Sequence, residues 1–216
     1  MDMMKKTITV ILATASVLYV SSCSRKNKFE HLIEAAKDNG CSRTRNLEYA
    51  NKTFNHWRGI EAGFYYIGDN PEDAQELYDV VINDLDLYPD YEIVSSAVLY
   101  ICEEDDETGE LFNQKVIYLR FGSKEDAAEY YADKTDGSFL KKTENRTGSA
   151  GYKYLICAKR YDANRNESDF VIRRGYYLDG NEVIVMEGRE TSEGSPKLID
   201  ECCRKTGLIS PAKIKV

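Results

Sequence analysis

The chain has 216 residues, of which 37 are acidic and 29 basic, and its formal net charge at pH 7 is −8. This balance argues against a nucleic-acid-binding protein, because neutralising phosphates requires clustered lysines and arginines. The length is sufficient for one well-buried domain, and the 16 tyrosines and 7 phenylalanines favour β-strands.

The first 22 residues predict a secretory signal. Lys5 and Lys6 precede an uncharged run of 14 residues, 7–20, and small residues follow that run. A helix of this length extends about 21 Å, which is shorter than the roughly 30 Å hydrocarbon core of a bilayer. A cleaved signal is therefore favoured over a membrane-spanning anchor.

The end of this signal carries a recognisable motif. Val20-Ser21-Ser22-Cys23 resembles the lipobox of bacterial lipoprotein precursors, in which an aliphatic and two small residues precede an invariant cysteine. The resemblance implies a signal peptide at 1–22 and a diacylglycerol on Cys23, with palmitate as a typical acyl chain. Two acyl chains suffice for stable anchoring at the extracytoplasmic face of the cell membrane. The alternatives are a cleaved signal with Cys23 in the core, or an uncleaved signal anchor.

After a polar tether at 23–27, the pattern predicts a helix over 28–39 that ends at Gly40. Residues 41–58 show no regular pattern. Residues 64–78 and 117–131 then match at 6 of 15 positions, and each predicts a strand, a tight turn and a capped amphipathic helix. The predicted N-caps are Asn70 and Ser123. A looser third version follows residues 182–187, with Ser195 as N-cap and Pro196 as the first helical residue. Duplication and the shared chemistry of helix starts both explain the match.

Further strands are predicted over 92–102, 111–121, 152–161, 170–178 and 182–187, with a polar loop at 136–149 and a hairpin turn at Asp179-Gly180. Consecutive strands with helices between groups predict an α+β fold with a mainly antiparallel sheet and helices packed on one face. We expect a single domain over 28–216. Two related halves, 28–90 and 91–216, are the alternative organisation.

Five cysteines remain beyond the signal, and no Cys-x-x-Cys occurs among them. Their number excludes complete pairing within the chain. Reduced core cysteines are favoured, while one long-range disulfide or a redox or metal role is the alternative. These residues are Cys41, Cys102, Cys157, Cys202 and Cys203.

Motifs for catalysis and metal binding are weak. The two histidines, His31 and His56, lack ligand-spaced partners. Residues 162–169 resemble the start of a calcium loop, but Glu167 occupies the position that requires glycine, and Arg173 stands where a bidentate glutamate belongs. A hairpin loop is expected there, as in the acidic run 103–110. We therefore predict no catalytic, metal or cofactor site.

The tether, the first helix and the strand–turn–Glu-Asp-Ala units are generally similar to small lipoproteins of Gram-positive bacteria, a resemblance that implies no activity. We expect a non-enzymatic, lipid-anchored extracytoplasmic domain that binds an envelope protein or a small ligand. The membrane contact is the lipid on Cys23, and tyrosines on the open face of the sheet are the expected contact surface. The alternatives are a transporter-accessory protein for a small molecule or metal, and an envelope enzyme using dispersed carboxylates or His56.

Overall fold

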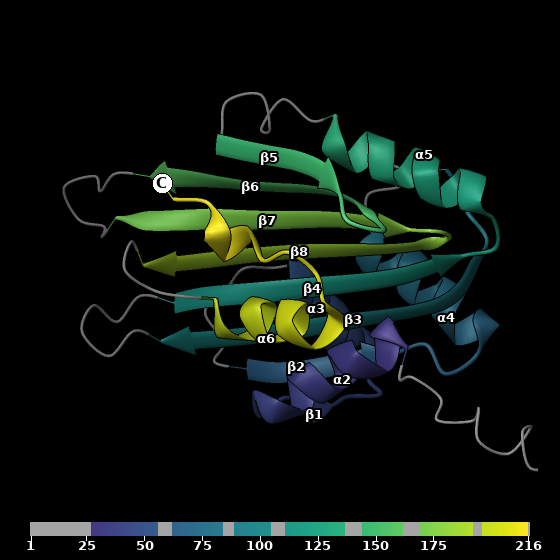
Figure 1. Ribbon diagram of the computed structural model, residues 1–216. Helices are drawn as coiled ribbons and strands as arrows, with labels where there is room; N and C mark the ends of the chain where they lie inside the picture. Colours follow the sequence, from purple (N-terminus) through teal and green to yellow (C-terminus); the bar gives the residue numbers. More distant parts are fainter. Residues whose placement is uncertain are drawn as a thin grey trace, which may run out of the picture.

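Two antiparallel meanders form one sheet in this computed structural model, which describes residues 27–55, 62–83, 89–104, 111–136, 144–161, 169–191 and 196–215. The strand order is β1-β2-β3-β4-β8-β7-β6-β5 (Figure 1). The β1–β2 pair is parallel and the other neighbouring pairs are antiparallel. The predicted α+β fold with a mainly antiparallel sheet is confirmed. The strands are β1 (Ser42–Arg43), β2 (Ala62–Ile67), β3 (Ile93–Glu104), β4 (Leu111–Phe121), β5 (Glu144–Ser149), β6 (Lys153–Tyr161), β7 (Phe170–Asp179) and β8 (Glu182–Thr191).

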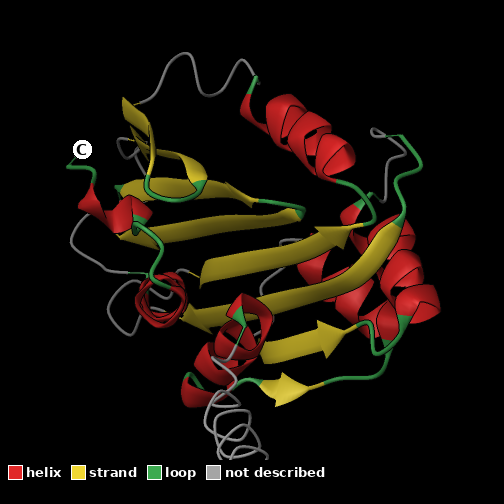
Figure 2. Ribbon diagram, turned by 45° about the vertical axis from the view of Figure 1, so that its right-hand side comes forward, coloured by secondary structure: helices red, strands yellow, loops and turns green. Residues whose placement is uncertain are grey.

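Helices cover both faces of the sheet (Figures 1 and 2). Helices α2 (Lys28–Asp38) and α6 (Lys197–Thr206) pack with Ala97 and Leu99 of β3. We call this side the front face. Helix α3 (Leu47–Asn55) and the π-helix η1 (Tyr78–Ile82), which continues α4 (Pro71–Leu77), pack with Val98 and Tyr100. We call that side the back face, and α5 (Lys124–Thr135) also lies on it. Successive strand residues point to opposite faces, so the alternation along β3 shows that the expected one-sided packing is wrong. Because β3 is apolar on both sides, both faces must be covered.

The predicted helix starts after β2 and β4 are confirmed. Asn70 Oδ1 accepts a hydrogen bond from the amide of Asp73 at 2.9 Å, and Ser123 Oγ accepts one from Asp126 at 3.0 Å. Each cap satisfies an amide that lacks an intrahelical partner. The third unit differs, because α6 lies on the front face and begins after Pro196. Ser195 lies outside the described residues, and duplication stays a hypothesis.

Two segments without a recognised pattern are regular. Residues 41–58 contain β1 and α3, and the predicted loop at 136–149 contains β5. Residues 145–149 of β5 are exposed, and backbone pairing with β6 holds this edge strand in place. A period-2 apolar pattern is therefore missing there. The last hairpin is also shifted by one residue, because Asp179 pairs with Glu182 and the turn residues are Gly180 and Asn181.

Burial explains the cysteines beyond residue 23. The five cysteines that we expected in the core are buried as free thiols. Cys203 Sγ lies 3.6 Å from Met186 Sδ and 3.8 Å from the hydroxyl of Tyr177, so the end of α6 packs directly on β7 and β8. Burial raises the pKa of the Cys203 thiol to about 12, which keeps it protonated.

A buried ion pair fixes the C-terminal segment on the front face. Arg173 on β7 pairs with Glu190 on β8, and their side chains are 11% and 6% exposed. The same guanidinium donates to two carbonyls of the 3₁₀ turn η3 (Pro211–Lys213) and its end. These are the carbonyl of Pro211, the first residue of η3, at 3.4 Å, and that of Ile214, which follows η3, at 2.6 Å. Burial raises the pKa of Glu190 to about 6, against the opposing effect of Arg173. Arg173 thus joins two strands and the C-terminal segment through one group.

We expect Arg173→Met to lower the free energy of unfolding by about 3 kcal/mol, because it leaves the Glu190 carboxylate buried without its charged partner. Denaturant unfolding measures this change. The matched control is Arg204→Met on α6, whose side chain is 68% exposed and pairs with Glu201. Exposed ion pairs contribute little, so the control should unfold like wild type. Equal effects of the two substitutions would contradict this account of the C-terminal segment.

Candidate functional site

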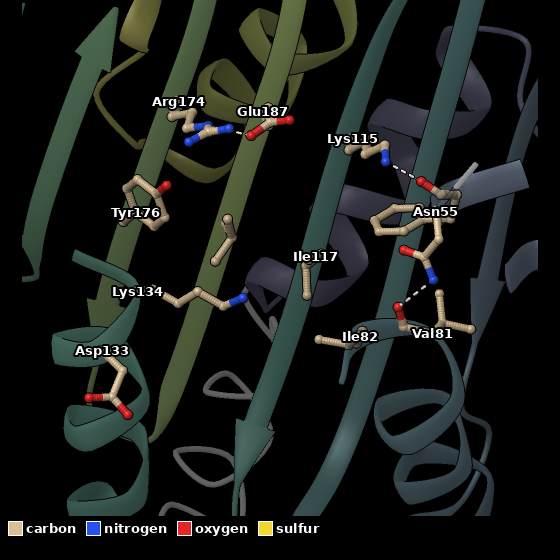
Figure 3. Close-up of a pocket in the computed structure, with 12 residues that line it drawn as sticks. Asn55, Val81, Ile82, Lys115, Ile117, Asp133, Lys134, Arg174, Tyr176 and Glu187 are labelled. Atoms are coloured by element: carbon tan, nitrogen blue, oxygen red, sulfur yellow. Dashed lines mark hydrogen bonds and ion pairs between the residues drawn. The ribbon is translucent and has the colours of Figure 1, made fainter. Parts of the chain in front are cut away.

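A pocket of about 420 Å³ lies on the back face, between the α3–η1 pair and α5 (Figure 3). Strands β4, β8 and β7 form its floor, and the helices form its two walls. Among the described residues, α3 and η1 lie over β2 and β3 while α5 contacts the ends of β4, β7 and β8, so no described helix covers the sheet between them. The pocket is thus a consequence of the gap between two groups of helices.

Two cross-strand rows of side chains make the floor. Strand register places Lys115 opposite Glu187 and Glu187 opposite Arg174. The adjacent row, two residues along each strand, consists of Ile117, Val185 and Tyr176. Side chains two residues apart on a strand share a face. A charged row therefore runs beside an apolar row across the same three strands.

The wall formed by α3 and η1 is held together by Asn55 at the end of α3. Its side-chain amide donates to the carbonyl of Val81 at 3.0 Å and to Asn51 Oδ1 at 2.6 Å. Val81 and Ile82 belong to the π-helix, whose wider turn is closed by the amide of Asn83 donating to the carbonyl of Tyr78 at 2.7 Å. π-turns occur often at functional sites. Here the π-turn directly lines the pocket.

Lys115 is the most perturbed charged group of the pocket. Its ammonium donates to the carbonyl of Phe54, at the end of α3, and lies 4.7 Å from the centre of the Phe54 ring. Burial lowers the pKa of Lys115 to about 8, and Glu187 opposes this shift. A perturbed ionisable group in a cleft is a physical indication of a functional site.

The remaining polar groups enter from the opposite side. Arg174 Nε pairs with Glu187, and burial raises the pKa of the Tyr176 phenol above its ordinary value, so that it stays neutral. Lys134 reaches over the floor from α5, with its ammonium 5.3 Å from the centre of the Tyr130 ring. Neighbouring Asp133 is exposed. The pocket thus combines cationic, carboxylate and phenolic groups around an apolar centre.

The residues singled out from sequence lie elsewhere. Cys23, His56 and residues 162–168 lie outside the described residues. His31 is half-buried on α2, with Nδ1 3.7 Å from Glu34 Oε2, on the face opposite the pocket. Within the described ranges, no group of three or more His, Cys, Asp or Glu side chains is arranged to hold a metal ion. In the same ranges no helix has the length and apolarity needed to cross a membrane.

Comparison with known proteins adds no further assignment. The chain matches no protein-family model, no curated protein and no solved structure. The geometry of the pocket and the sequence of residues 1–23 are therefore the observations that bear on function.

The pocket was not predicted, although the sequence of its strands contains an indication of it. The two-residue spacing places Lys115 on the same strand face as Ile117 and Leu119, and Arg174 on the same face as Tyr176. A charge on the apolar face of a predicted strand departs from the usual pattern and marks a site to be explained. Glu187 shows the same departure in β8.

We expect the stability difference between Lys115→Met and wild type to depend on pH. The pKa of Lys115 is about 8 in the folded chain against 10.5 for an ordinary lysine. Below pH 8, burial of the charged ammonium therefore lowers the free energy of unfolding. As the pH rises from 8 towards 10.5, the folded state loses this proton before the unfolded state does, and wild type is stabilised. The advantage of the methionine variant should therefore fall by on the order of 2 kcal/mol between pH 7 and 10.

Unfolding at several pH values measures this difference. Both proteins contain the other charged groups that line the pocket, so the titration of these groups contributes to the stability of both. These groups are Glu187, Arg174, Lys134 and Asp133. Lys197→Met on α6, whose side chain is 73% exposed, is the matched control and should show no pH-dependent difference. A Lys115→Met difference that is constant with pH would show that the ammonium is not buried.

Proposed function

We propose that this chain is a lipid-anchored extracytoplasmic binding domain that holds a small ligand in the back-face pocket. The observation that carries the proposal is the preformed concavity, in which a charged row and an apolar row converge with walls from α3, η1 and α5. Binding sites for small molecules are typically concave, mostly preformed, and carry a few placed polar groups. The anchor is supported by the lipobox-like sequence that ends at Cys23.

The pocket chemistry favours binding over catalysis. Of the two carboxylates that line it, Glu187 is engaged by Arg174, and Asp133 is exposed on α5. A carboxylate whose oxygens are engaged in an ion pair is poorly placed to exchange a proton with a ligand. An accessory role in small-molecule transport is compatible with the same pocket, because both require reversible ligand binding at the membrane.

The start of the described chain suits this function. It begins at Asn27, which caps α2 on the front face, and the proposed lipid acceptor Cys23 precedes Asn27 by four residues in the sequence. The pocket opens on the opposite side of the sheet. A domain held to the membrane through its front face would leave the pocket accessible to solutes.

The anchor is tested by metabolic labelling with an alkyne-bearing palmitate in a bacterial host. We expect wild type to incorporate the label and to fractionate with membranes, and Cys23→Ala to do neither, because the thiol is the only acceptor that the lipobox provides. Ser22→Ala keeps a small residue before the cysteine and should be labelled like wild type. Labelling of Cys23→Ala at the wild-type level would overturn the anchor.

The pocket is tested by filling it. The double variant Ile117→Phe/Val185→Phe places two larger side chains on the apolar row without changing charge. The lipidated chain in phosphatidylcholine nanodiscs is screened by thermal unfolding against amino acids, sugars, nucleotides and carboxylic acids. A ligand at 100 times its Kd stabilises the folded state by about 2.7 kcal/mol. We expect compounds that stabilise wild type and not the filled variant. A screen in which no compound distinguishes the two proteins would contradict the proposed function.

A further inference from the structure

The charge of the pocket is opposite in sign to that of the chain. The chain has 37 acidic and 29 basic residues, whereas the pocket is lined by three basic side chains, Lys115, Lys134 and Arg174, and two acidic ones, Asp133 and Glu187. These basic groups come from β4, α5 and β7, so the tertiary fold brings them together from distant parts of the sequence. Glu187 is already held by Arg174. A cationic pocket in an acidic protein selects anions from a mixture of solutes.

Lys115 makes this selection energetically favourable. Lys115 is half-buried, and its ammonium lies over the Phe54 ring and donates to the Phe54 carbonyl, a neutral acceptor. The cost of removing this cation from water is already incurred in the folded protein, and its position is fixed by the end of α3. A ligand anion that reaches Lys115 would therefore gain a charge-assisted contact in a partly desolvated site, where such contacts are strong.

The apolar row defines the rest of the ligand. Ile117, Val185 and Tyr176 lie directly beside the charged row, and Ile82 points toward Ile117 from the π-helix. The volume of about 420 Å³ is at the small end of the range for ligand sites. Such a space accommodates an apolar body of up to three rings or a short chain, and an ion alone would leave the apolar row unused.

We propose that the ligand is a small amphiphilic anion, in which one carboxylate, phosphate or sulfonate group is attached to an apolar body. The anionic group lies among Lys115, Lys134 and Arg174, and the body lies along Ile117 and Val185. This inference rests on the proposed function of the pocket and names the class of its ligand.

Two fluorescent probes with the same ring system separate the contribution of charge from that of apolar contact. 1-Anilinonaphthalene-8-sulfonate carries one anionic group, and N-phenyl-1-naphthylamine lacks it. Both are titrated at pH 7 into the full lipidated chain in phosphatidylcholine nanodiscs, with empty nanodiscs as the blank. We expect the sulfonate probe to bind wild type at least about tenfold more tightly than the neutral probe, because it alone forms charge-assisted contacts.

Substitutions of the basic side chains locate the anionic group. Lys115→Met and Lys134→Met should each weaken binding of the sulfonate probe about tenfold and leave the neutral probe unchanged. Lys134 lies half-buried on α5, so its variant keeps the test valid if Lys115→Met is poorly folded. Lys197→Met, on the front-face helix α6, removes the same charge away from the pocket and should change neither affinity.

The outcomes separate this inference from the function on which it rests. Equal affinities of the two probes, unaffected by either pocket lysine and both lost in Ile117→Phe/Val185→Phe, would overturn the anionic ligand and leave the binding pocket in place. Wild-type affinities of both probes in the filled variant would place their binding elsewhere and remove the support for both proposals.

Discussion

A wide sheet with two apolar faces must be covered on both sides, and this constraint shapes the whole molecule. Strand β3 carries buried side chains on either face, with Ala97 and Leu99 pointing forward and Val98 and Tyr100 pointing back. Helices α2 and α6 cover the front, where one large core joins both meanders. On the back, helices cover β2 and β3 at one side and the ends of β4, β7 and β8 at the other. Between them the floor changes from apolar to charged, as exposure to water requires.

The pocket follows from that incomplete cover. The row formed by Lys115, Glu187 and Arg174 lies between the two groups of described helices, with the end of α3 against Lys115. The row formed by Ile117, Val185 and Tyr176 lies beside it. Strands β4, β7 and β8 therefore contribute both to the core and to the floor of the pocket. Burial of Lys115 is tolerated because its ammonium donates a hydrogen bond to the Phe54 carbonyl and is attracted by the negative charge of Glu187.

The parts of the fold that could be predicted are those determined by residues close together in the sequence. Helix caps and element ends depend on neighbouring residues, so the local pattern can place them. The features predicted in this way are the caps at Asn70 and Ser123, the end of β4 and the start of α2. Strand β5 could not be predicted, because its pairing with β6 supplies its stability. The distribution of helices over both faces depends on tertiary packing, which the order of elements does not specify.

The pocket depends on contacts that are still less local. Lys115 and Glu187 are brought opposite each other by the pairing of β4 with β8, which joins the two meanders. Neither residue stands in a motif, and their strands are separated by α5, β5, β6 and β7. The alternation within each strand placed both charges on an apolar face. Only the register between strands shows that these faces coincide.

Anion selection by the pocket depends most directly on the charge state of Lys115. Lysines labelled with ¹³C at Cε are titrated by NMR in the full chain, and the Lys115 signal is assigned by its loss in Lys115→Met. The account predicts a midpoint near pH 8 without ligand, and a higher midpoint when the bound sulfonate probe stabilises the ammonium. A midpoint at the ordinary lysine value that the probe leaves unchanged would contradict it, because Lys115 would then be neither buried nor in contact with a bound anion.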